Sequence, residues 1–311
     1  MFYEFFIARR YLRSSRKGGF ISFSTYISVG GVTVGVAALI IVLSVMNGFE
    51  TEVRDRIVST DAHIRVLTSD NRGIRDYERI VASLEKREHV LAAVPFVYAE
   101  SMLSFQGRSV GARVLGVDPR IDEVTDLREN LRCGDLVFWV PGDGRDSPGA
   151  ILGMALADRL GVGVGDRITV LGAQGGEGFS PWPFTRVRRF VVTGLFETGL
   201  YDYDASLVYI PLRVAQSLFQ TGETVTGIGL RVDDIYSAQR VAQQITRELG
   251  YPFLALSWME QNRTLFNWMT IEKWALFLAL SLIILVAAFN IISTLVMLVM
   301  ELLVALIPPV A

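Results

Sequence analysis

Cysteine and histidine are almost absent from this sequence, which holds one Cys and two His residues among 311. A sole thiol, Cys133, excludes an internal disulfide. His63 and His89 have no second histidine or cysteine at ligand spacing, which leaves no zinc site of the usual types. The sequence also lacks a G-x-S-x-G motif, and no serine or cysteine has an obvious general base. The residues therefore predict neither a catalytic centre nor a metal site.

Two other patterns have both a functional and a structural interpretation. The glycine-rich run Gly161–Gly165 resembles a nucleotide loop, but it lacks the Walker lysine and precedes a strand instead of a helix. We interpret it as a tight turn that leads into a strand at Asp166. The acidic run Glu197–Asp204 suggests an acid–base pair or a calcium loop, but its spacing fits no EF-hand. We predict a structured turn with two exposed tyrosines.

Charge is missing from two long runs, Gly18–Phe49 and Trp274–Met300. Each run is long enough to cross the hydrocarbon core of a bilayer. Core helices of soluble proteins rarely extend so far without a charge. We therefore predict transmembrane helices over residues 27–46 and 274–300.

The basic residues predict the orientation of the chain. Residues 1–26 carry a net charge of +4, whereas the loop 47–273 contains 25 basic and 30 acidic residues. Short basic flanks stay in the cytoplasm, and long loops are translocated regardless of charge. The N-terminus is expected inside and the loop outside. A cleaved signal peptide is the alternative, but the first run is too long and no small-x-small cleavage site follows it. The net charge of −2 for the whole chain argues against a nucleic-acid partner.

The outer loop is expected to form an α+β domain. Residues 47–61 continue the first helix out of the membrane, and a strand–helix–strand order then occurs twice, over 62–105 and 227–256. This repetition predicts a split ferredoxin-like layer that brackets an inserted, β-rich lobe at about 110–222. The expected strands are 62–67, 90–105 (interrupted at Pro95), 150–152, 162–171, 188–195, 206–210, 227–232 and 253–256, and the expected helices are 76–87, 153–160 and 235–249.

Three features suggest contacts with other proteins or helices. The loop Gly172–Arg186 carries prolines, a Trp and a Phe, and either packs on its own lobe or protrudes to contact a partner. Gly31 and Gly35 form a G-x-x-x-G motif that allows close helix approach, although such motifs also arise by chance in glycine-rich spans. Asn290 is an uncharged polar residue within the second predicted span. Such a side chain suits a helix interface or the wall of a cavity better than contact with lipid.

Several strings together resemble a known family. Ala8–Ser22, Val42–Glu50 (VLSVMNGFE), Leu115–Pro119 (LGVDP) and Val192–Asp204 (VTGLFETGLYDYD) are similar to the LolC/LolE permease subunits of the lipoprotein-releasing ABC transporter. The domain layout resembles the wider MacB/FtsX-type permeases, whose periplasmic core has a ferredoxin-like part and an inserted lobe. The resemblance covers residues 1–300 almost continuously.

The resemblance implies a role in lipoprotein export at the bacterial inner membrane. Such a complex takes a triacylated lipoprotein from the outer leaflet of that membrane and passes it to a periplasmic carrier. ATP would be bound by separate cytoplasmic ATPase subunits, so this chain would be no enzyme and hold no cofactor. Its partners would be the ABC ATPase, a second permease subunit, the lipoprotein, the carrier and membrane lipid.

The resemblance also implies two sets of site residues. The acyl chains would occupy a cavity between the first span of one permease subunit and the second span of its partner. Residues placed at this cavity or at the helix interface are Gly31, Gly35, Met46, Asn47, Gly48, Phe49 and Asn290. A hook that recruits the carrier would lie at Gly172–Arg189, with candidate residues Pro181, Trp182, Pro183, Phe184, Arg186 and Arg188.

One departure from the family and three alternatives remain. Family members continue past Val296–Glu301 into a basic coupling segment and two more spans, whereas residues 301–311 form a short apolar tail here. We therefore expect a truncated or frameshifted product. The alternatives are a MacB/FtsX-like permease for another substrate, a two-span membrane sensor and an extracytoplasmic peptidase.

Overall fold

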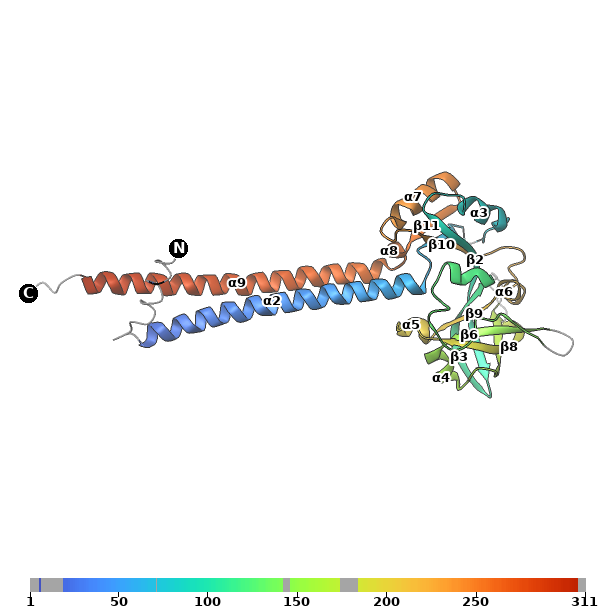
Figure 1. Cartoon of the computed structure of the whole chain (residues 1–311), viewed down its shortest axis with the longest axis horizontal. Coiled ribbons are helices and arrows are strands. Elements are labelled where there is room, and N and C mark those ends of the chain that lie inside the picture. Colours follow the sequence, from blue (N-terminus) through green and yellow to red (C-terminus); the bar gives the residue numbers. More distant parts are fainter. Residues whose placement is uncertain (1–5, 7–18, 71, 142–145, 174–183, 307–311) are drawn as a thin grey trace, which may run out of the picture. The chain divides into compact units, whose positions relative to one another are not determined.

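The computed structural model describes Phe6 and residues 19–70, 72–141, 146–173 and 184–306. One compact unit comprises Met1–Thr51 and Thr264–Ala311, and the other comprises Glu52–Arg263. The helices, labelled in Figure 1, are α2 (Gly19–Thr60), α3 (Tyr77–Leu84), η1 (Pro119–Glu123), α4 (Met154–Leu160), α5 (Tyr201–Asp204), α6 (Leu212–Phe219), α7 (Ala238–Leu249), α8 (Trp258–Gln261) and α9 (Arg263–Leu306). The strands are β1 (Ile64–Thr68), β2 (Val90–Phe105), β3 (Arg108–Val117), β4 (Leu131–Gly134), β5 (Trp139–Val140), β6 (Ser147–Gly153), β7 (Arg167–Ala173), β8 (Phe184–Phe196), β9 (Leu207–Pro211), β10 (Gly227–Val232) and β11 (Phe253–Ser257).

The two long helices contain the predicted membrane spans. By length and composition, Val29–Thr60 in α2 and Arg263–Met297 in α9 are apolar enough to cross a bilayer. Helix α2 also continues through Thr60 without a break, as the pattern over 47–61 predicts. Large apolar side chains point outward along both helices, among them Val34 and Leu278, each 69% exposed. Such surfaces are stable in lipid and costly in water.

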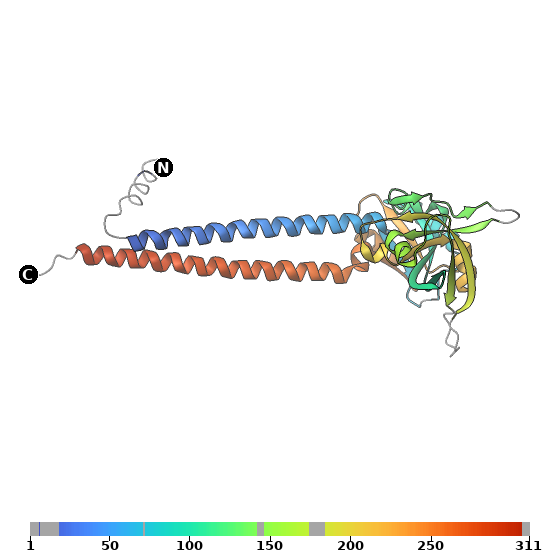
Figure 2. The ribbon, with the colours of Figure 1, turned by 90° about the horizontal axis from the view of Figure 1, so that it is seen from below.

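Helices α2 and α9 lie side by side in both ribbon views (Figures 1 and 2). We call the residues along their contact the seam. Along α2 they follow the three- and four-residue spacing of coiled-coil-like packing, whereas on α9 a longer gap separates Leu280 from Ala287. On α2 the half-buried seam residues are Val32, Gly35, Ala38, Leu39, Val42, Leu43, Met46 and Glu50. On α9 they are Lys273, Leu276, Leu280, Ala287, Ile291 and Thr294. A Cβ atom added to Gly35 would lie 3.8 Å from Cγ2 of Ile283, so the Ile283 side chain packs over Gly35.

In its described residues, the second unit contains one mixed sheet of eleven strands. Strands β11, β1, β10 and β2 lie in that order, and each neighbouring pair is antiparallel. Helices α3 and α7 connect the strands within the two β-α-β units, burying Val81 and Leu84 from α3 and Val241 and Ile245 from α7. This is the predicted ferredoxin-like layer (Figure 1).

Strand β2 joins this layer to the rest of the sheet. Its first half pairs with β10, and its second half, from Phe96 to Phe105, pairs with β3. The sheet continues through β9, β6, β8 and β4, while β7 pairs with both β2 and β8. One hydrophobic cluster extends across the junction, from Val94 and Phe96 in β2 to Ile151 and Tyr209 in the lobe. The lobe therefore shares its core with the ferredoxin-like layer.

A buried carboxylate organises the loop that follows β8. Asp204 Oδ1 accepts hydrogen bonds from the Thr198 backbone N–H at 2.8 Å and from the Thr198 hydroxyl at 2.9 Å, and Oδ2 accepts from the Gly199 N–H at 3.1 Å. Gly199 has a φ of +76°, and a Cβ there would lie 1.6 Å from a guanidinium nitrogen of Arg56 in α2. The loop is therefore shaped for the close approach of α2.

Several expectations are wrong in detail. Strand β2 passes through Pro95 without interruption, and Pro95 stands opposite Ile228 in the ladder with β10. The strand can continue because the φ that the proline ring fixes, about −65°, lies within the β region. Residues 162–166 form a turn and the strand begins at Arg167, since the glycines there favour positive φ, as at Gly165. Of the two tyrosines predicted to be exposed, Tyr201 is 70% exposed, but Tyr203 is half-buried against the core cluster. The helix expected from Ile235 begins at Ala238.

Asp204→Ala is expected to destabilise the outer unit. The substitution leaves two backbone N–H groups and a hydroxyl without their acceptor, which costs about 2 kcal/mol or more. For a domain of this size the melting temperature should fall by roughly 5 °C, measured by circular dichroism on the detergent-solubilised chain. Asp202→Ala is the matched control, because Asp202 is exposed and accepts hydrogen bonds from Arg113 and Ser206 through its backbone carbonyl. Equal melting temperatures for Asp204→Ala and the parent would contradict the assignment.

Gly35→Leu is expected to disrupt the helix pair, because a Cβ at this position already reaches van der Waals contact with Ile283 and the rest of the leucine side chain would extend beyond it. Overpacking at such a contact costs about 1–3 kcal/mol. Gly31→Leu is the control, since a Cβ at Gly31 meets nothing within 4 Å. Thermal aggregation of the solubilised, isolated chain should begin at a lower temperature for Gly35→Leu only. Equal onset for both variants would show that the seam does not depend on Gly35.

Candidate functional site

The predicted membrane-site residues divide between the seam and the outward faces of the helices. Gly35 and Met46 lie in the seam, whereas Gly31 is exposed with open space around it. The G-x-x-x-G motif therefore contributes one glycine, not two, to the contact within the chain.

The remaining predicted residues are exposed and contribute little to the seam. Asn47, Gly48 and Phe49 are exposed, with Phe49 at 56%. Asn290 is also exposed, and its backbone carbonyl accepts the Thr294 hydroxyl at 2.8 Å. A polar amide and an aromatic ring on outward faces are available to a neighbouring helix of another subunit.

The predicted hook joins two paired strands. Strands β7 and β8 form an antiparallel hairpin in which Ala173 stands opposite Phe184, so residues 174–183 connect its arms. Pro181, Trp182 and Pro183 lie outside the described residues. Phe184 begins β8, and the described arginines, Arg186 and Arg188, are exposed on that strand.

The part of this hairpin next to residues 174–183 carries a cationic and partly apolar surface, which we call the arginine surface. Arg186, Arg188 and Arg213 line a cavity of about 370 Å³ together with Trp139, Val187 and Leu218. Arg186 also donates to the Ser217 carbonyl at 3.0 Å, which ties β8 to α6. Trp139 is 42% and Val187 63% exposed. Three cations beside exposed apolar side chains suit a partner surface that is acidic and apolar.

Sequence reasoning missed Trp139 and Arg213. Trp139 lies in the two-residue strand β5, which is too short to give a periodic signal. Arg213 lies on α6, whose Leu212, Ala215 and Leu218 are buried at helical spacing. That spacing was the available signal, and it would have placed Arg213 on the exposed face.

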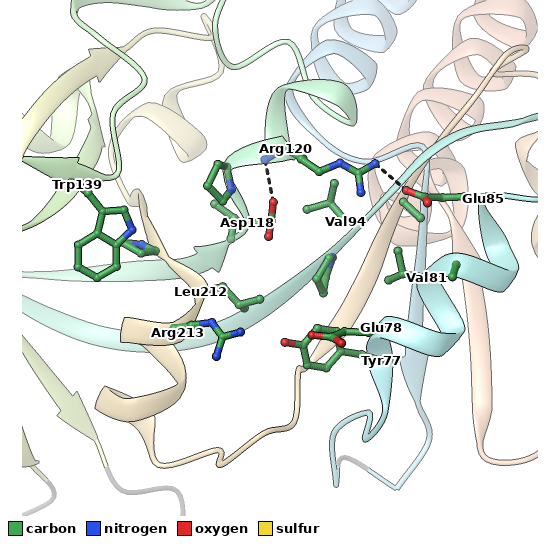
Figure 3. Close-up of a pocket in the computed structure, with 16 residues that line it drawn as sticks. Tyr77, Glu78, Val81, Glu85, Val94, Asp118, Arg120, Trp139, Leu212 and Arg213 are labelled. Carbon is green, nitrogen blue, oxygen red and sulfur yellow. Dashed lines mark hydrogen bonds and ion pairs between the residues drawn. The ribbon is translucent and has the colours of Figure 1, made fainter.

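A second groove adjoins the arginine surface (Figure 3). It has a volume of about 460 Å³ and an apolar floor that includes Val94, Val117 and Leu212. Figure 3 shows Tyr77 and Glu78 of α3 along one side, with Arg213 and Trp139 opposite. Arg120 bridges Glu85 at 2.7 Å and Glu123 at 2.7 Å, which fastens η1 to α3 beside the groove.

The root of α2 in the outer unit holds a network of charged and aromatic side chains. Arg65 donates to both carboxylate oxygens of Asp61, at 2.5 and 2.6 Å, and the Tyr203 hydroxyl donates to Asp61 at 3.3 Å. Burial and the charge of Asp61 raise the pKa of Tyr203, so this phenol is neutral and acts as a donor. The Arg113 guanidinium lies 5.4 Å from the Tyr203 ring centre. This network anchors α2 to the sheet.

The histidines have structural surroundings. Burial, with the charge of Arg231, lowers the pKa of His63, whose Nδ1 lies 3.2 Å from the backbone of Val232. His89 pairs with Asp233 on the surface at 2.9 Å, and this hydrogen bond raises the pKa of His89. Within the described residues, no three His, Cys, Asp or Glu side chains gather as metal ligands do. Cys133 is exposed on β4.

Comparison with known proteins gives relatives over nearly the whole chain. The model of the MacB-like periplasmic core domain matches residues 25–248. The lipoprotein-releasing system transmembrane protein LolC of Neisseria meningitidis is 34% identical over 96% of this chain and 71% of its own length. LolC of Xylella fastidiosa is 34% identical over 95% of this chain and 70% of its own, and LolE of Haemophilus influenzae is 30% identical over 94% and 70%.

One solved structure with a similar fold is the periplasmic region of MacB from Actinobacillus actinomycetemcomitans. It covers 68% of this chain and 95% of its own, with 14% identity and a TM-score of 0.43. The family assignment depends on the sequence matches, which extend through both apolar helices and the outer unit. The chain belongs to the LolC/LolE family of lipoprotein-releasing system transmembrane proteins and carries a MacB-like periplasmic core domain.

Proposed function

We propose that this chain is a permease subunit of an ABC-type complex that extracts lipoproteins from the bacterial inner membrane. The observation that carries the proposal is the 34% identity with LolC over 96% of the chain. Because that alignment includes both apolar helices as well as the outer unit, it supports a shared membrane path and not the outer fold alone. The complex passes each lipoprotein to a periplasmic carrier for delivery to the outer membrane.

In this proposal the N-terminus is cytoplasmic and the outer unit is periplasmic. The net charge of +4 on residues 1–26 supports that orientation. The energy comes from ATP bound by a separate ATPase subunit, and this chain is not itself an enzyme. The glycine-rich turn over residues 162–166 resembles a nucleotide loop in sequence. It leads into strand β7, however, and not into a helix whose N-terminus could bind a phosphate.

The acyl chains pass between this helix pair and a second permease subunit. The outward position of Phe49 and Asn290 supports this path, because the seam of the chain does not use them. Phe49 and the neighbouring Asn47 and Gly48 lie where α2 leaves its charge-free run, at the depth of the lipid headgroups. A lipid-modified protein has its acyl chains on one side of that depth and its polypeptide on the other.

The β7–β8 hairpin recruits the carrier. The arginine surface supports this role, since Arg186 and Arg188 of the predicted hook line a cationic cavity together with the exposed Trp139. Aromatic and arginine side chains supply much of the binding energy in protein interfaces. The carrier surface that fits here is acidic and apolar.

Depletion of this chain is expected to strand lipoproteins in the inner membrane, and the affinity-tagged chain is expected to co-purify with an ATP-binding subunit. Both follow if the chain forms the membrane path but draws its energy from a partner. The measurements are sucrose-gradient separation of the two membranes and mass spectrometry of the purified complex. Normal lipoprotein sorting in depleted cells, with loss of a different exported substrate, would identify a MacB/FtsX-like permease for that substrate.

Charge reversal on the hairpin is expected to weaken carrier binding. Arg186→Glu and Arg188→Glu together should raise the Kd for the carrier at least about tenfold, because two interfacial cations become repulsive to an acidic partner. Surface plasmon resonance on the solubilised complex measures the change. Arg189→Glu is the matched control, since Arg189 is exposed on the same strand but does not line the cavity. Equal weakening by the control would indicate a general charge effect.

A further inference from the structure

The two charge-free runs end at residues that meet each other. Glu50 is the first charged residue after Gly18–Phe49, and Lys273 is the last before Trp274–Met300. In the structure the Lys273 ammonium donates to a carboxylate oxygen of Glu50. The charges that border the two spans on the same side of the membrane are therefore paired across the helices.

Both residues belong to the seam. Glu50 follows Met46 by one helical turn, and Lys273 precedes Leu276 by three residues, so each continues the apolar contact line of its helix. The Glu50 side chain is 24% exposed and that of Lys273 is 36% exposed. The adjacent charge on α9, Glu272, is exposed, so the contact is specific to the seam position.

The pair is placed where an ion pair has a large effect on helix packing. Trp268 and Trp274, which are 68% and 67% exposed, mark the headgroup region where indole rings concentrate. At this depth the pair is less screened than on a water-exposed surface, and removal of one partner leaves a charge at the edge of the hydrocarbon. A slip of one helical turn moves the partners by about 5.4 Å and breaks their contact.

We propose that Glu50 and Lys273 act as positioning residues that latch α2 to α9 at the outer end of the spans and fix the register of the seam. With the latch closed, the two helices of one chain move as a single body. The acyl chains then pass between permease subunits and not between the helices of one chain. This last step rests on the proposed function, whereas the latch itself does not.

Disulfide trapping in the full complex, in native membranes, tests the latch. Gly35→Cys and Ile283→Cys are introduced into a Cys133→Ser background, since the two sites lie in contact and no other cysteine is present. After mild oxidation, mass spectrometry quantifies the linked peptide. Glu50→Lys or Lys273→Glu should each lower its yield about fivefold, the effect of a modest loss of packing energy, and the double exchange should restore it. Glu272→Lys is the control that leaves the yield unchanged.

The outcomes separate the latch from the proposed function. The latch is overturned if the double exchange stays as low as the single variants, or if the single variants keep the parental yield. If the charge-reversal variants fail to insert into the membrane, Glu50→Gln and Lys273→Gln are used instead. The parental yield of linked peptide in both of these variants would overturn the latch.

Lipoprotein release is then measured with the 35–283 disulfide formed and reduced. If the helices move as one body, the oxidised and reduced complexes are expected to release lipoprotein equally. Loss of release in the oxidised complex alone would overturn the passage of acyl chains between subunits. Absence of release from the parent complex would count against the proposed function and leave the trapping result intact.

Discussion

The insolubility of two long apolar helices in water is the constraint on which the rest of this structure depends. Charge-free runs of this length have their lowest free energy in lipid, and each backbone polar group within them is satisfied by its own helix. One helix precedes the outer unit and the other follows it, so the domain between them is tethered at both ends. The seam then aligns the helices through small and apolar residues, with Gly35 beneath the Ile283 side chain.

Within the outer unit, the end of α2 is held by contacts with the sheet and its loops. Helix α2 continues into the outer unit, where Arg56 approaches Gly199 and the Asp61–Arg65 pair meets Tyr203. Buried charges of this kind are stable only when they are paired and hydrogen-bonded. Because the same loop is held by Asp204 and leads into β9 of the shared sheet, the root of α2 is continuous with the core.

The shared core also explains why the outer unit can present a surface to a partner. The long strand β2 carries the ladder from the ferredoxin-like layer into the lobe, and one cluster of apolar side chains fills the junction. The hairpin of β7 and β8 therefore projects from a rigid sheet. Its arginines, with Arg213 from α6, form a cationic surface in the part of the chain that the structure describes. Binding surfaces held on rigid scaffolds lose less entropy when a partner docks.

The amino-acid sequence by itself determined the two spans, the ferredoxin-like layer and the family, because charge-free length, helical spacing and the VMNGFE and ETGLYDYD strings are local properties. It could not predict that Asn290 and Gly31 are exposed while Gly35 lies in the seam, since the residues that a uniformly apolar helix buries depend on what it packs against. It could not assign a role to Asp204, because the hydrogen-bond donors of Thr198 and Gly199 are brought to its carboxylate only by the folded turn. Trp139 and Arg213 likewise meet Arg186 only through the sheet, as their separation in the chain gives no signal. The tertiary structure alone paired Glu50 with Lys273, because two charges more than two hundred residues apart become neighbours only when the helices find their register.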